Sequence, residues 1–588
     1  MQTYRPPVDD IRFQLETFDY NGRLHGLPGF EEFDLDTGMS LLTALTDYMA
    51  SEIAPLNQKG DKEGVRFNPA DNSVTLPEGF RAAYEGLVEN GFVAMPCDPE
   101  YGGMGAPFCL SLLAGEVLVA SNKSLSMCSG LSGGFIEALH AHGSAEQKAE
   151  YLPNLISGKW SGTMCLTEPQ AGSDLGLVQT TAEPDGDGFK ITGTKIWISF
   201  GEHDLCDNII HLVLARLPGA PAGIKGISTF IVPKFLADGT RNTVFCTGTD
   251  HKMGIHASPT CVITLDGAKG WMIGEAHKGM RSMFVMMNAA RLNVGIEGVA
   301  LADAAYQAAL AFAQDRRQSR SLNPARNEAG QAADNILVHP DVRRMLLNIK
   351  STNEPLRGLV AMIAVAYDRM LHHPDAAVRA EAEDLVALMT PIIKSFGSER
   401  GFLNVSEAMQ VMGGSGFTTD WPVEQYLRDV RIAMIYEGTN HIQALDLVGR
   451  KLPLGGGRLL QSFAAEVTAT IEKAAQNPEL APFAEALGKE AGRLTNTTMG
   501  LMGRAMEDAE EVGAAASNYL NQFALNTLGY VWLRQLLFLA DQPDSDRKRG
   551  KLQTARYFFE MVLPEAALYA KRASVGKAPM MDFDIRLL

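Results

Sequence analysis

The chain has 588 residues, 46% of them hydrophobic and 21% charged, which is typical of a globular protein of several domains and excludes a disordered or collagen-like chain. Its 52 Lys and Arg against 69 Asp and Glu give a net charge of −17. This balance argues against nucleic acid or an anionic membrane as a partner, because both bind basic surfaces.

The chain is expected to be cytoplasmic and to lack a membrane span. The first 20 residues lack the apolar core of a secretory signal. The longest purely apolar stretch, 359–367, is far shorter than the ~20 residues a transmembrane helix needs. Seven cysteines lie between Cys97 and Cys261 without a C-x-x-C pair, which favours reduced thiols over disulfides or a metal site.

Periodicity divides the chain into successive regions. Residues 1–40, with two adjacent prolines and the turn-rich LHGLPGFEEFD, predict an ordered but irregular N-terminal arm. Apolar residues at three- and four-residue spacing predict an α-domain over 41–160. Runs of β-branched and aromatic residues between turns predict an antiparallel β-domain over 161–280.

Helical spacing returns over 281–452, and an Ala-rich helical domain is predicted over 459–588 after KLPLGGGR, which has the composition of a linker. The predicted fold class is therefore α+β, with helices, strands, helices and further helices in that order. No G-x-G-x-x-G follows a strand, which argues against a Rossmann nucleotide site.

Five strings carry a family resemblance: MCLTEPQAGSDLG at 164–176, KIWISFG at 195–201, FAQDRRQS at 312–319, QVMGGSGF at 410–417 and LRDVRIAMIYEGTNHIQ at 427–443. In this order and spacing they resemble the acyl-CoA dehydrogenases, flavoenzymes that oxidise acyl-CoA thioesters to 2-enoyl-CoA. The resemblance implies an N-terminal α-domain, a central β-domain and a C-terminal helical bundle, with the last region as an additional helical domain.

The resemblance places the catalytic base at Glu437, in the IYEGT string. The α-proton of a thioester is weakly acidic, so a carboxylate must remove it at contact distance, and burial favours this by raising the carboxyl pKa. Some branches of the family place the base immediately before an Arg on the first long bundle helix. That position is Ala290, before Arg291, and alanine cannot act as a base.

FAD is the implied cofactor. Its ring and pyrophosphate are expected on the β-domain, at Met164, Leu166, Thr167, Ser173, Trp197 and Ser199. Trp197 is expected to pack along the flavin, with Ser199 near its N5 atom. The glycine of the QAGSD string lets the backbone approach a phosphate closely.

The FAD tail is expected at Arg316, Gln318, Gln410, Gly413 and Gly414. Arginine suits a pyrophosphate because its charged fork binds two oxygens at once. The family string usually ends Q-F-G, whereas this chain continues from Gln318 into Ser319 and Arg320, so packing at this end of FAD differs from the family pattern.

Thr439 is expected to contact the flavin beside the base, and Ser173, Arg291 and Gly438 to bind acyl-CoA. His441 is either a second titrating group near the site or, more commonly for a lone histidine, a structural residue. Because family members build the FAD site from two subunits, a homodimer is implied, with an electron-transfer flavoprotein as the electron acceptor.

The N-terminal arm, the EGTNHIQALDLVGRKLP run and the helical extension resemble the 3-methylmercaptopropionyl-CoA dehydrogenase group, whose substrate is 3-(methylthio)propanoyl-CoA. The extension also resembles that of very-long-chain enzymes. Three alternatives stay open: a medium- to very-long-chain dehydrogenase, an acyl-CoA oxidase that forms peroxide, and a non-catalytic acyl-CoA-binding protein.

Overall fold

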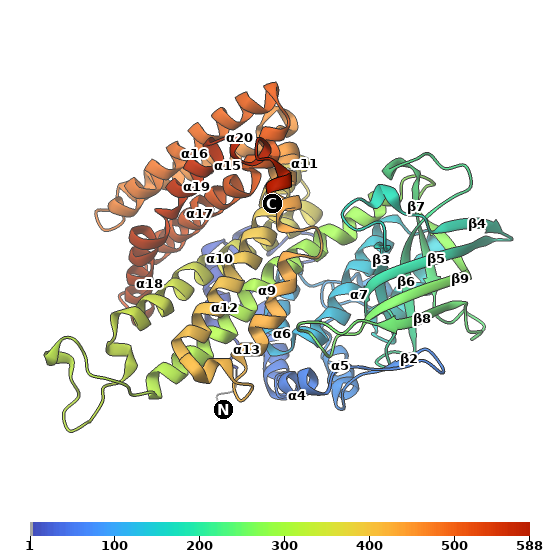
Figure 1. Ribbon diagram of the computed structural model, residues 1–588, viewed down its shortest axis with the longest axis horizontal. Coiled ribbons are helices and arrows are strands. Elements are labelled where there is room, and N and C mark those ends of the chain that lie inside the picture. The colour runs from blue at the N-terminus through green and yellow to red at the C-terminus, as the bar shows by residue number, and fades with distance from the viewer. Residues whose placement is uncertain (1–3) are drawn as a thin grey trace. The chain divides into compact units, whose positions relative to one another are not determined.

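The computed structural model describes residues 4–588, apart from the side chains of Val285 and Asn288. The chain forms two compact units (Figure 1). Residues 36–293 are called the sheet unit, and residues 4–35 with 294–588 the bundle unit. Among the described residues, no helix is both long and apolar enough to cross a bilayer.

Several helices of the sheet unit precede its main sheet. They are α3 (Leu35–Tyr48), α4 (Leu56–Glu63), α5 (Phe80–Glu89), α6 (Phe108–Ser121), α7 (Lys123–His142) and α8 (Ala145–Ile156). Helix α8 begins at a capping box in which Ser144 and Gln147 satisfy each other's backbone amides. A short hairpin, β1 (Arg66–Asn68) and β2 (Ser73–Thr75), interrupts the predicted helical region.

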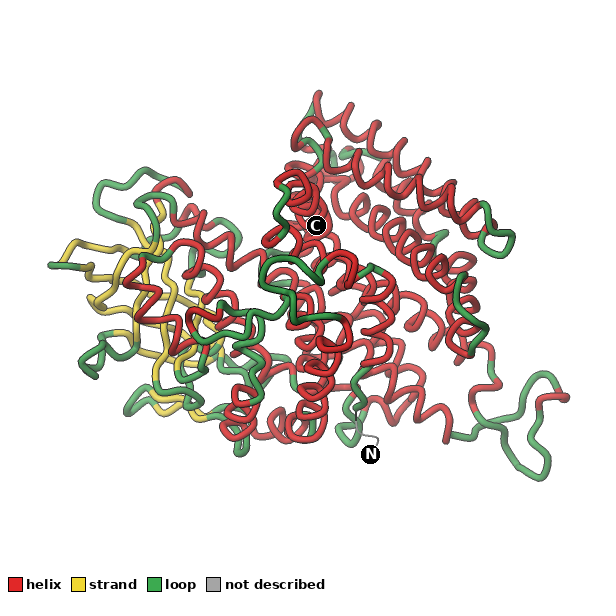
Figure 2. Tube along the Cα trace, turned by 180° about the vertical axis from the view of Figure 1, so that it is seen from behind, coloured by secondary structure: helices red, strands yellow, loops and turns green. Residues whose placement is uncertain are grey.

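All strands in the described part of the chain belong to the sheet unit (Figure 2). The main sheet contains β3 (Trp160–Cys165), β4 (Thr181–Asp185), β5 (Gly188–Ser199), β6 (Asn208–Arg216), β7 (Ile227–Pro233), β8 (Val244–Thr249) and β9 (Thr260–Ile273). Its order is β3-β6-β4-β5-β9-β7, with β8 on β9. Most strand pairs are antiparallel, as predicted, but β6 runs parallel to β3 and, at one residue pair, to β4. The β4–β5 hairpin lies between β3 and β6 in sequence, so β6 returns beside β3 in the same direction.

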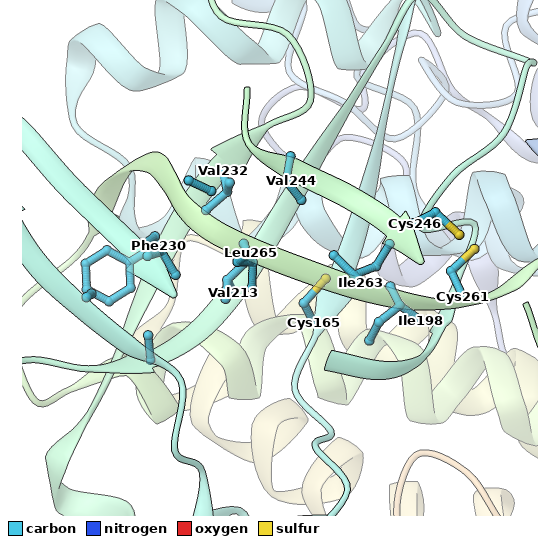
Figure 3. Close-up of a cluster of buried hydrophobic side chains, with 14 of the residues drawn as sticks. Cys165, Ile198, Val213, Phe230, Val232, Val244, Cys246, Cys261, Ile263 and Leu265 are labelled. Carbon is cyan, nitrogen blue, oxygen red and sulfur yellow. The ribbon is translucent and has the colours of Figure 1, made fainter. Parts of the chain in front are cut away.

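The core of this sheet consists of side chains from alternating strand positions. Figure 3 shows Cys165, Ile198, Val213, Ile263 and Leu265 gathered between the strands, all buried. Along β5, by contrast, the buried residues Ile191, Lys195 and Ile198 are not spaced by two, because the pairing of β5 with β9 shifts register between Ile191 and Gly193 and again between Lys195 and Ile198. The second shift decides which residues near Ile198 are left accessible.

The bundle unit is helical. Its first helices are α1 (Val8–Thr17), α2 (Tyr20–Arg23), α10 (Pro340–His372), α11 (Ala376–Ile392), α12 (Ser398–Met412), α13 (Val423–Val430) and α14 (Asn440–Asp446). Helix α9 (Gly279–Asp315) begins in the sheet unit and continues into the bundle unit.

The C-terminal extension consists of α15 (Arg458–Ala475), α16 (Ala481–Glu507), α17 (Glu510–Ala540), α18 (Asp546–Tyr557), α19 (Glu565–Ser574) and α20 (Ala578–Met581). Helices α16, α17 and α19 lie side by side (Figure 1). The predicted linker before them is a tight turn in which Gly455, Gly456 and Gly457 all have positive φ. The buried Trp532 of α17 donates its Nε1 hydrogen to the Ser351 carbonyl of α10 at 3.0 Å, so the extension shares a core with the bundle.

The prediction of an irregular N-terminal arm is wrong for residues 8–17, which form α1. Ile11, Phe13 and Leu15 of this helix are buried, and such tertiary burial stabilises a helix that local propensity leaves ambiguous. Asp10 accepts from Arg357 at 2.8 Å and from Lys551 at 2.7 Å. Burial raises the pKa of Asp10, but the two cations outweigh it and hold the pKa well below its usual value, so the ionised carboxylate joins the arm to α10 and α18.

Candidate active site

Glu437 lies in a short turn of the bundle unit between α13 and α14. Its backbone is left-handed, with φ of 57°, and Gly438 follows with φ of 83°. A glutamate with a left-handed backbone conformation destabilises the fold by about 1–3 kcal/mol, and this conformation persists only where the surrounding structure imposes it. The turn is therefore held in place by its neighbours.

Side chains from three helical segments hold this turn. The Tyr436 hydroxyl lies 2.6 Å from both carboxylate oxygens of Glu297, on α9. Gln443 Nε2 donates to the Glu437 carbonyl at 3.1 Å, and Lys394 Nζ donates to the Gly438 carbonyl at 2.6 Å. These bonds fix the backbone on both sides of the Glu437 carboxylate.

A side chain at Gly438 would displace the Gln443 amide that bonds to the Glu437 carbonyl. A Cβ at this position would lie 2.8 Å from Gln443 Nε2, and the positive φ disfavours any L side chain.

Burial and the Glu297 carboxylate raise the pKa of Tyr436 well above its ordinary value. The hydroxyl therefore stays protonated and donates to Glu297 throughout the physiological pH range.

Thr439 and His441 have visible structural roles. The Thr439 hydroxyl accepts from the Ile442 amide at 3.3 Å and caps the start of α14. His441 Nδ1 lies 3.0 Å from the hydroxyl of Ser517, on α17. The His441 contact supports the structural interpretation of this residue, and the flavin contact of Thr439 stays a prediction.

The residues predicted for the FAD tail are exposed in the bundle unit: Arg316, Gln318, Gln410, Gly413 and Gly414. Phe312, one turn before Arg316, packs edge-to-face on Trp421 with ring centroids 5.5 Å apart, which brings the end of α9 to the segment after the two glycines. No atom lies within 4 Å of a Cβ built on Gly413 or Gly414. A ligand can thus approach this backbone closely.

The other predicted FAD residues lie in the sheet unit. Met164, Leu166 and Thr167 occupy the end of β3 and the residues just after it, and Trp197 and Ser199 lie at the end of β5. The Ile196 amide donates to the Thr167 carbonyl at 2.9 Å, which brings these two segments together.

Trp197 is unusual for a large aromatic residue of a strand. It lies where the pairing of β5 with β9 is irregular, its φ is 60°, and it is 63% exposed. Bulges redirect side chains and are frequent beside active sites. The irregularity turns an indole face away from the core, where a planar ring can stack on it.

A buried ion pair connects the segment after β3 to the end of β5. Lys195 Nζ lies 2.7 Å from Glu168 Oε1, with side chains 0% and 3% exposed. Lys195 also donates to the Leu166 carbonyl at 3.1 Å, and Glu168 accepts from the Thr180 amide and hydroxyl. Burial raises the pKa of Glu168, but Lys195 and these donors lower it to about 2, so the carboxylate is ionised.

Ser173 and Arg291, predicted to bind acyl-CoA, lie apart in sequence and differ in environment. Ser173 is exposed on the loop after β3, and no atom lies within 4 Å of a Cβ built on the adjacent Gly172. Arg291 is buried on α9. The structure therefore leaves Ser173 accessible to a ligand, and the role of each residue stays a prediction.

Sequence reasoning missed Lys195, Glu168, Lys394, Tyr436, Glu297 and Gln443. A signal was present for the two lysines, because each is a lone cation in an otherwise apolar run: TKIWIS for Lys195 and TPIIKSFG for Lys394. Such a lysine must be either accessible or compensated by partners. The partners themselves are distant in sequence, so no spacing identifies them.

Each unit contains residues whose chemistry suits part of a flavin dinucleotide. The accessible indole of Trp197 offers a stacking surface for the ring. The open backbone at Gly172, Gly413 and Gly414 and the exposed Arg316 offer positions for phosphates. These are the two chemistries that FAD requires.

Four family models match the chain in order. They are "Acyl-CoA dehydrogenase, N-terminal domain" at 38–159, "Acyl-CoA dehydrogenase, middle domain" at 163–268, "Acyl-CoA dehydrogenase, C-terminal domain" at 277–452 and "Acetyl-CoA dehydrogenase C-terminal like" at 463–584. Together they span the sheet unit, the bundle and the extension.

Several relatives match most of the chain. A 3-methylmercaptopropionyl-CoA dehydrogenase of Ruegeria pomeroyi is 40% identical over 96% of this chain and 97% of its own length. A broad-specificity linear acyl-CoA dehydrogenase, FadE5, of Mycobacterium tuberculosis is 35% identical over 92% of this chain and 88% of its own.

Solved structures share the fold. Caenorhabditis elegans ACDH-11, in complex with C11-CoA, superposes with a TM-score of 0.79 at 17% identity, covering 99% of this chain and 96% of that one. An acyl-CoA dehydrogenase of Bacillus anthracis complexed with FAD gives 0.77 at 22% identity, covering 92% and 88%. The chain therefore belongs to the acyl-CoA dehydrogenase family and is an FAD-dependent oxidoreductase.

Proposed function

We propose that the chain catalyses α,β-dehydrogenation of an acyl-CoA thioester, with Glu437 as the base. The Glu437 carboxylate takes the α-proton, the β-hydrogen leaves as hydride, and the product is the 2-enoyl-CoA. FAD, when bound, supplies the acceptor for that hydride and its two electrons. The observation that carries the proposal is the strained turn at Glu437, which Tyr436, Gln443 and Lys394 hold from both sides.

The remaining proposed residues bind the cofactor and the substrate. Thr167, Trp197 and Ser199 would hold the flavin ring, and Arg316, Gln318, Gln410, Gly413 and Gly414 the dinucleotide tail. Met164, Leu166, Ser173 and Thr439 would complete the cofactor contacts. Ser173, Arg291 and Gly438 would bind the acyl-CoA. An electron-transfer flavoprotein as acceptor is proposed from the family resemblance.

We further propose 3-(methylthio)propanoyl-CoA as the preferred substrate, with 3-(methylthio)acryloyl-CoA as product. The support is the 40% identity to the Ruegeria pomeroyi enzyme across nearly the whole of both chains. The chemistry is compatible because the thioether sulfur lies beyond the β-carbon and leaves the α- and β-hydrogens in place. The α,β-dehydrogenation then proceeds as for a straight acyl chain.

The test is kcat/KM for 3-(methylthio)propanoyl-CoA against butanoyl-, pentanoyl-, octanoyl- and palmitoyl-CoA. Pentanoyl-CoA is the matched control, since it replaces only the sulfur with a methylene. A hydrophobic pocket separates such near-isosteres by ~1–3 kcal/mol, so we expect the thioether to be preferred while pentanoyl-CoA still reacts. A tenfold or greater preference for palmitoyl-CoA would replace this substrate with a very-long-chain one.

A second candidate, a broad-specificity linear acyl-CoA dehydrogenase, is favoured by the 35% identity to the mycobacterial relative. Near-equal kcat/KM for butanoyl-, octanoyl- and palmitoyl-CoA would support it. Measuring peroxide in air with the same substrates separates a dehydrogenase from an oxidase, because only the oxidase passes its electrons to oxygen at the rate of turnover.

The holoenzyme is expected to be a homodimer. The predicted FAD-tail residues Arg316, Gln410, Gly413 and Gly414 are exposed in the bundle unit, as required if a second subunit completes their site. Light scattering of the FAD-loaded protein should give the mass of two chains. A mass of one chain would remove the shared site, and a mass of four would show that the extension leaves a second interface open.

A further inference from the structure

Lys394 is a fully buried lysine on a π-helical turn, Ile393–Gly397, between α11 and α12. Such turns are rare in helices and frequent at functional sites. Placing an ammonium group in a protein interior costs several kcal/mol unless good hydrogen bonds compensate it. A buried lysine at this position would therefore destabilise the fold unless its hydrogen bonds compensated the lost hydration.

The ammonium group of Lys394 is directed at the turn that carries Glu437. Its Nζ donates to the Gly438 carbonyl at 2.6 Å and to Asn440 Oδ1 at 3.2 Å. Asn440 Nδ2 donates back to the Ser395 carbonyl at 3.1 Å. The π-helical turn and the start of α14 are thus joined around the residue that follows Glu437.

The π-helical turn is itself set firmly against α9. A Cβ on Gly298 would lie 2.1 Å from the Gly397 carbonyl oxygen, so the two backbones are in direct contact there. The same helix α9 carries Glu297, which accepts from Tyr436. Lys394 and Tyr436 therefore fix the two ends of the Glu437 turn to one rigid pair of elements.

We propose that Lys394 is a positioning residue for α-proton abstraction. Its charge-assisted bond holds the peptide after Glu437, and so sets the direction from which the carboxylate meets the thioester α-carbon. Displacement of a reacting group by about 1 Å can cost 10²-fold in rate. This inference rests on the proposed role of Glu437 as the base.

The experiment compares K394M with wild-type holoenzyme, using butanoyl-CoA and its α,α-dideuterated form. Methionine keeps the length of the side chain but removes its charge and its donors. We expect kcat to fall at least tenfold while KM stays within threefold, because the lost interaction matters in the transition state. The α-deuterium isotope effect on kcat should rise, since proton abstraction becomes more strongly rate-limiting.

Two further variants keep the test decisive. K551M, on α18, removes another buried lysine, one that pairs with Asp10 and Glu354. It should lose stability with kcat per bound FAD and isotope effect unchanged. K394R keeps the charge and should recover more kcat than K394M. If K394M does not fold, N440A breaks the same linkage and should shift kcat and the isotope effect in the same direction.

A kcat for K394M within threefold of wild type, with an unchanged isotope effect, would show that Lys394 only stabilises the fold. The outcome for E437Q separates this failure from that of the proposed function. An active E437Q would overturn the base assignment itself. An inactive E437Q beside a fully active K394M would overturn only the role of Lys394.

Discussion

Glu437→Gln should abolish nearly all turnover while leaving the protein yellow and able to bind acyl-CoA. The amide preserves the shape and backbone of the turn, which Tyr436, Gln443 and Lys394 still hold. It cannot accept the α-proton, and general-base catalysis typically contributes 10²–10⁴-fold. We therefore expect kcat to fall by about 10³-fold, measured by anaerobic bleaching of the flavin and by steady-state turnover.

Glu399 provides a matched control. It lies at the start of α12, is partly buried, and its pKa is raised by that burial. Burial raises the pKa of Tyr569 on α19, and the Glu399 carboxylate lies close enough to contribute to that rise. E399Q makes the same chemical change at a carboxylate outside the Glu437 turn and should keep kcat within threefold. An E437Q enzyme retaining more than a tenth of the wild-type rate would place the base elsewhere.

Lys195→Met should destabilise the sheet unit and lower its affinity for FAD. The substitution leaves the Glu168 carboxylate buried without its cation, and breaking a buried pair in this way costs about 3–5 kcal/mol. It also removes the bond from Lys195 to the Leu166 carbonyl, so that the backbone bond from Ile196 to Thr167 remains as a link between this segment and the strand that carries Trp197. Urea-induced unfolding and the ratio of flavin to protein absorbance after purification measure the two effects.

Lys190 on the same strand is the control, because it is exposed and pairs with exposed Asp185. K190M should change the free energy of unfolding by less than about 1 kcal/mol. The double variant E168Q/K195M removes both charges and should recover part of the stability lost in K195M. Equal unfolding of K195M and K190M would show that the buried pair contributes nothing.

The pair also predicts a pH dependence. The pKa of Glu168 is lowered to about 2 in the folded protein, so its contribution to stability is present above the unfolded-state value of about 4.3. That contribution is lost as the pH falls from there towards 2. Acid titration of wild type should therefore show a loss of stability over this range that is larger than in E168Q/K195M, which keeps only the contribution of other paired carboxylates such as Asp10.

The sequence was sufficient for the fold class and the family, because both depend on local patterns. Three- and four-residue apolar spacing indicates helices, and runs of β-branched and aromatic residues between turns indicate strands, whichever partners they later find. The five strings likewise contain their own information: IYEGT identifies Glu437 and KIWIS identifies Trp197 without reference to the rest of the chain.

Only the tertiary structure decided what holds those residues. Residues 8–17 became helical because Ile11 and Phe13 are buried, and β3 became parallel to β6 because a hairpin separates them in sequence. The supporting pairs are also non-local: Lys195 binds Glu168, 27 residues away, and Tyr436 binds Glu297, 139 residues away. A charged side chain looks the same in a sequence whether it ends in water or against a buried partner. The two cases differ in desolvation, and only the packed chain determines which side chains lose their water.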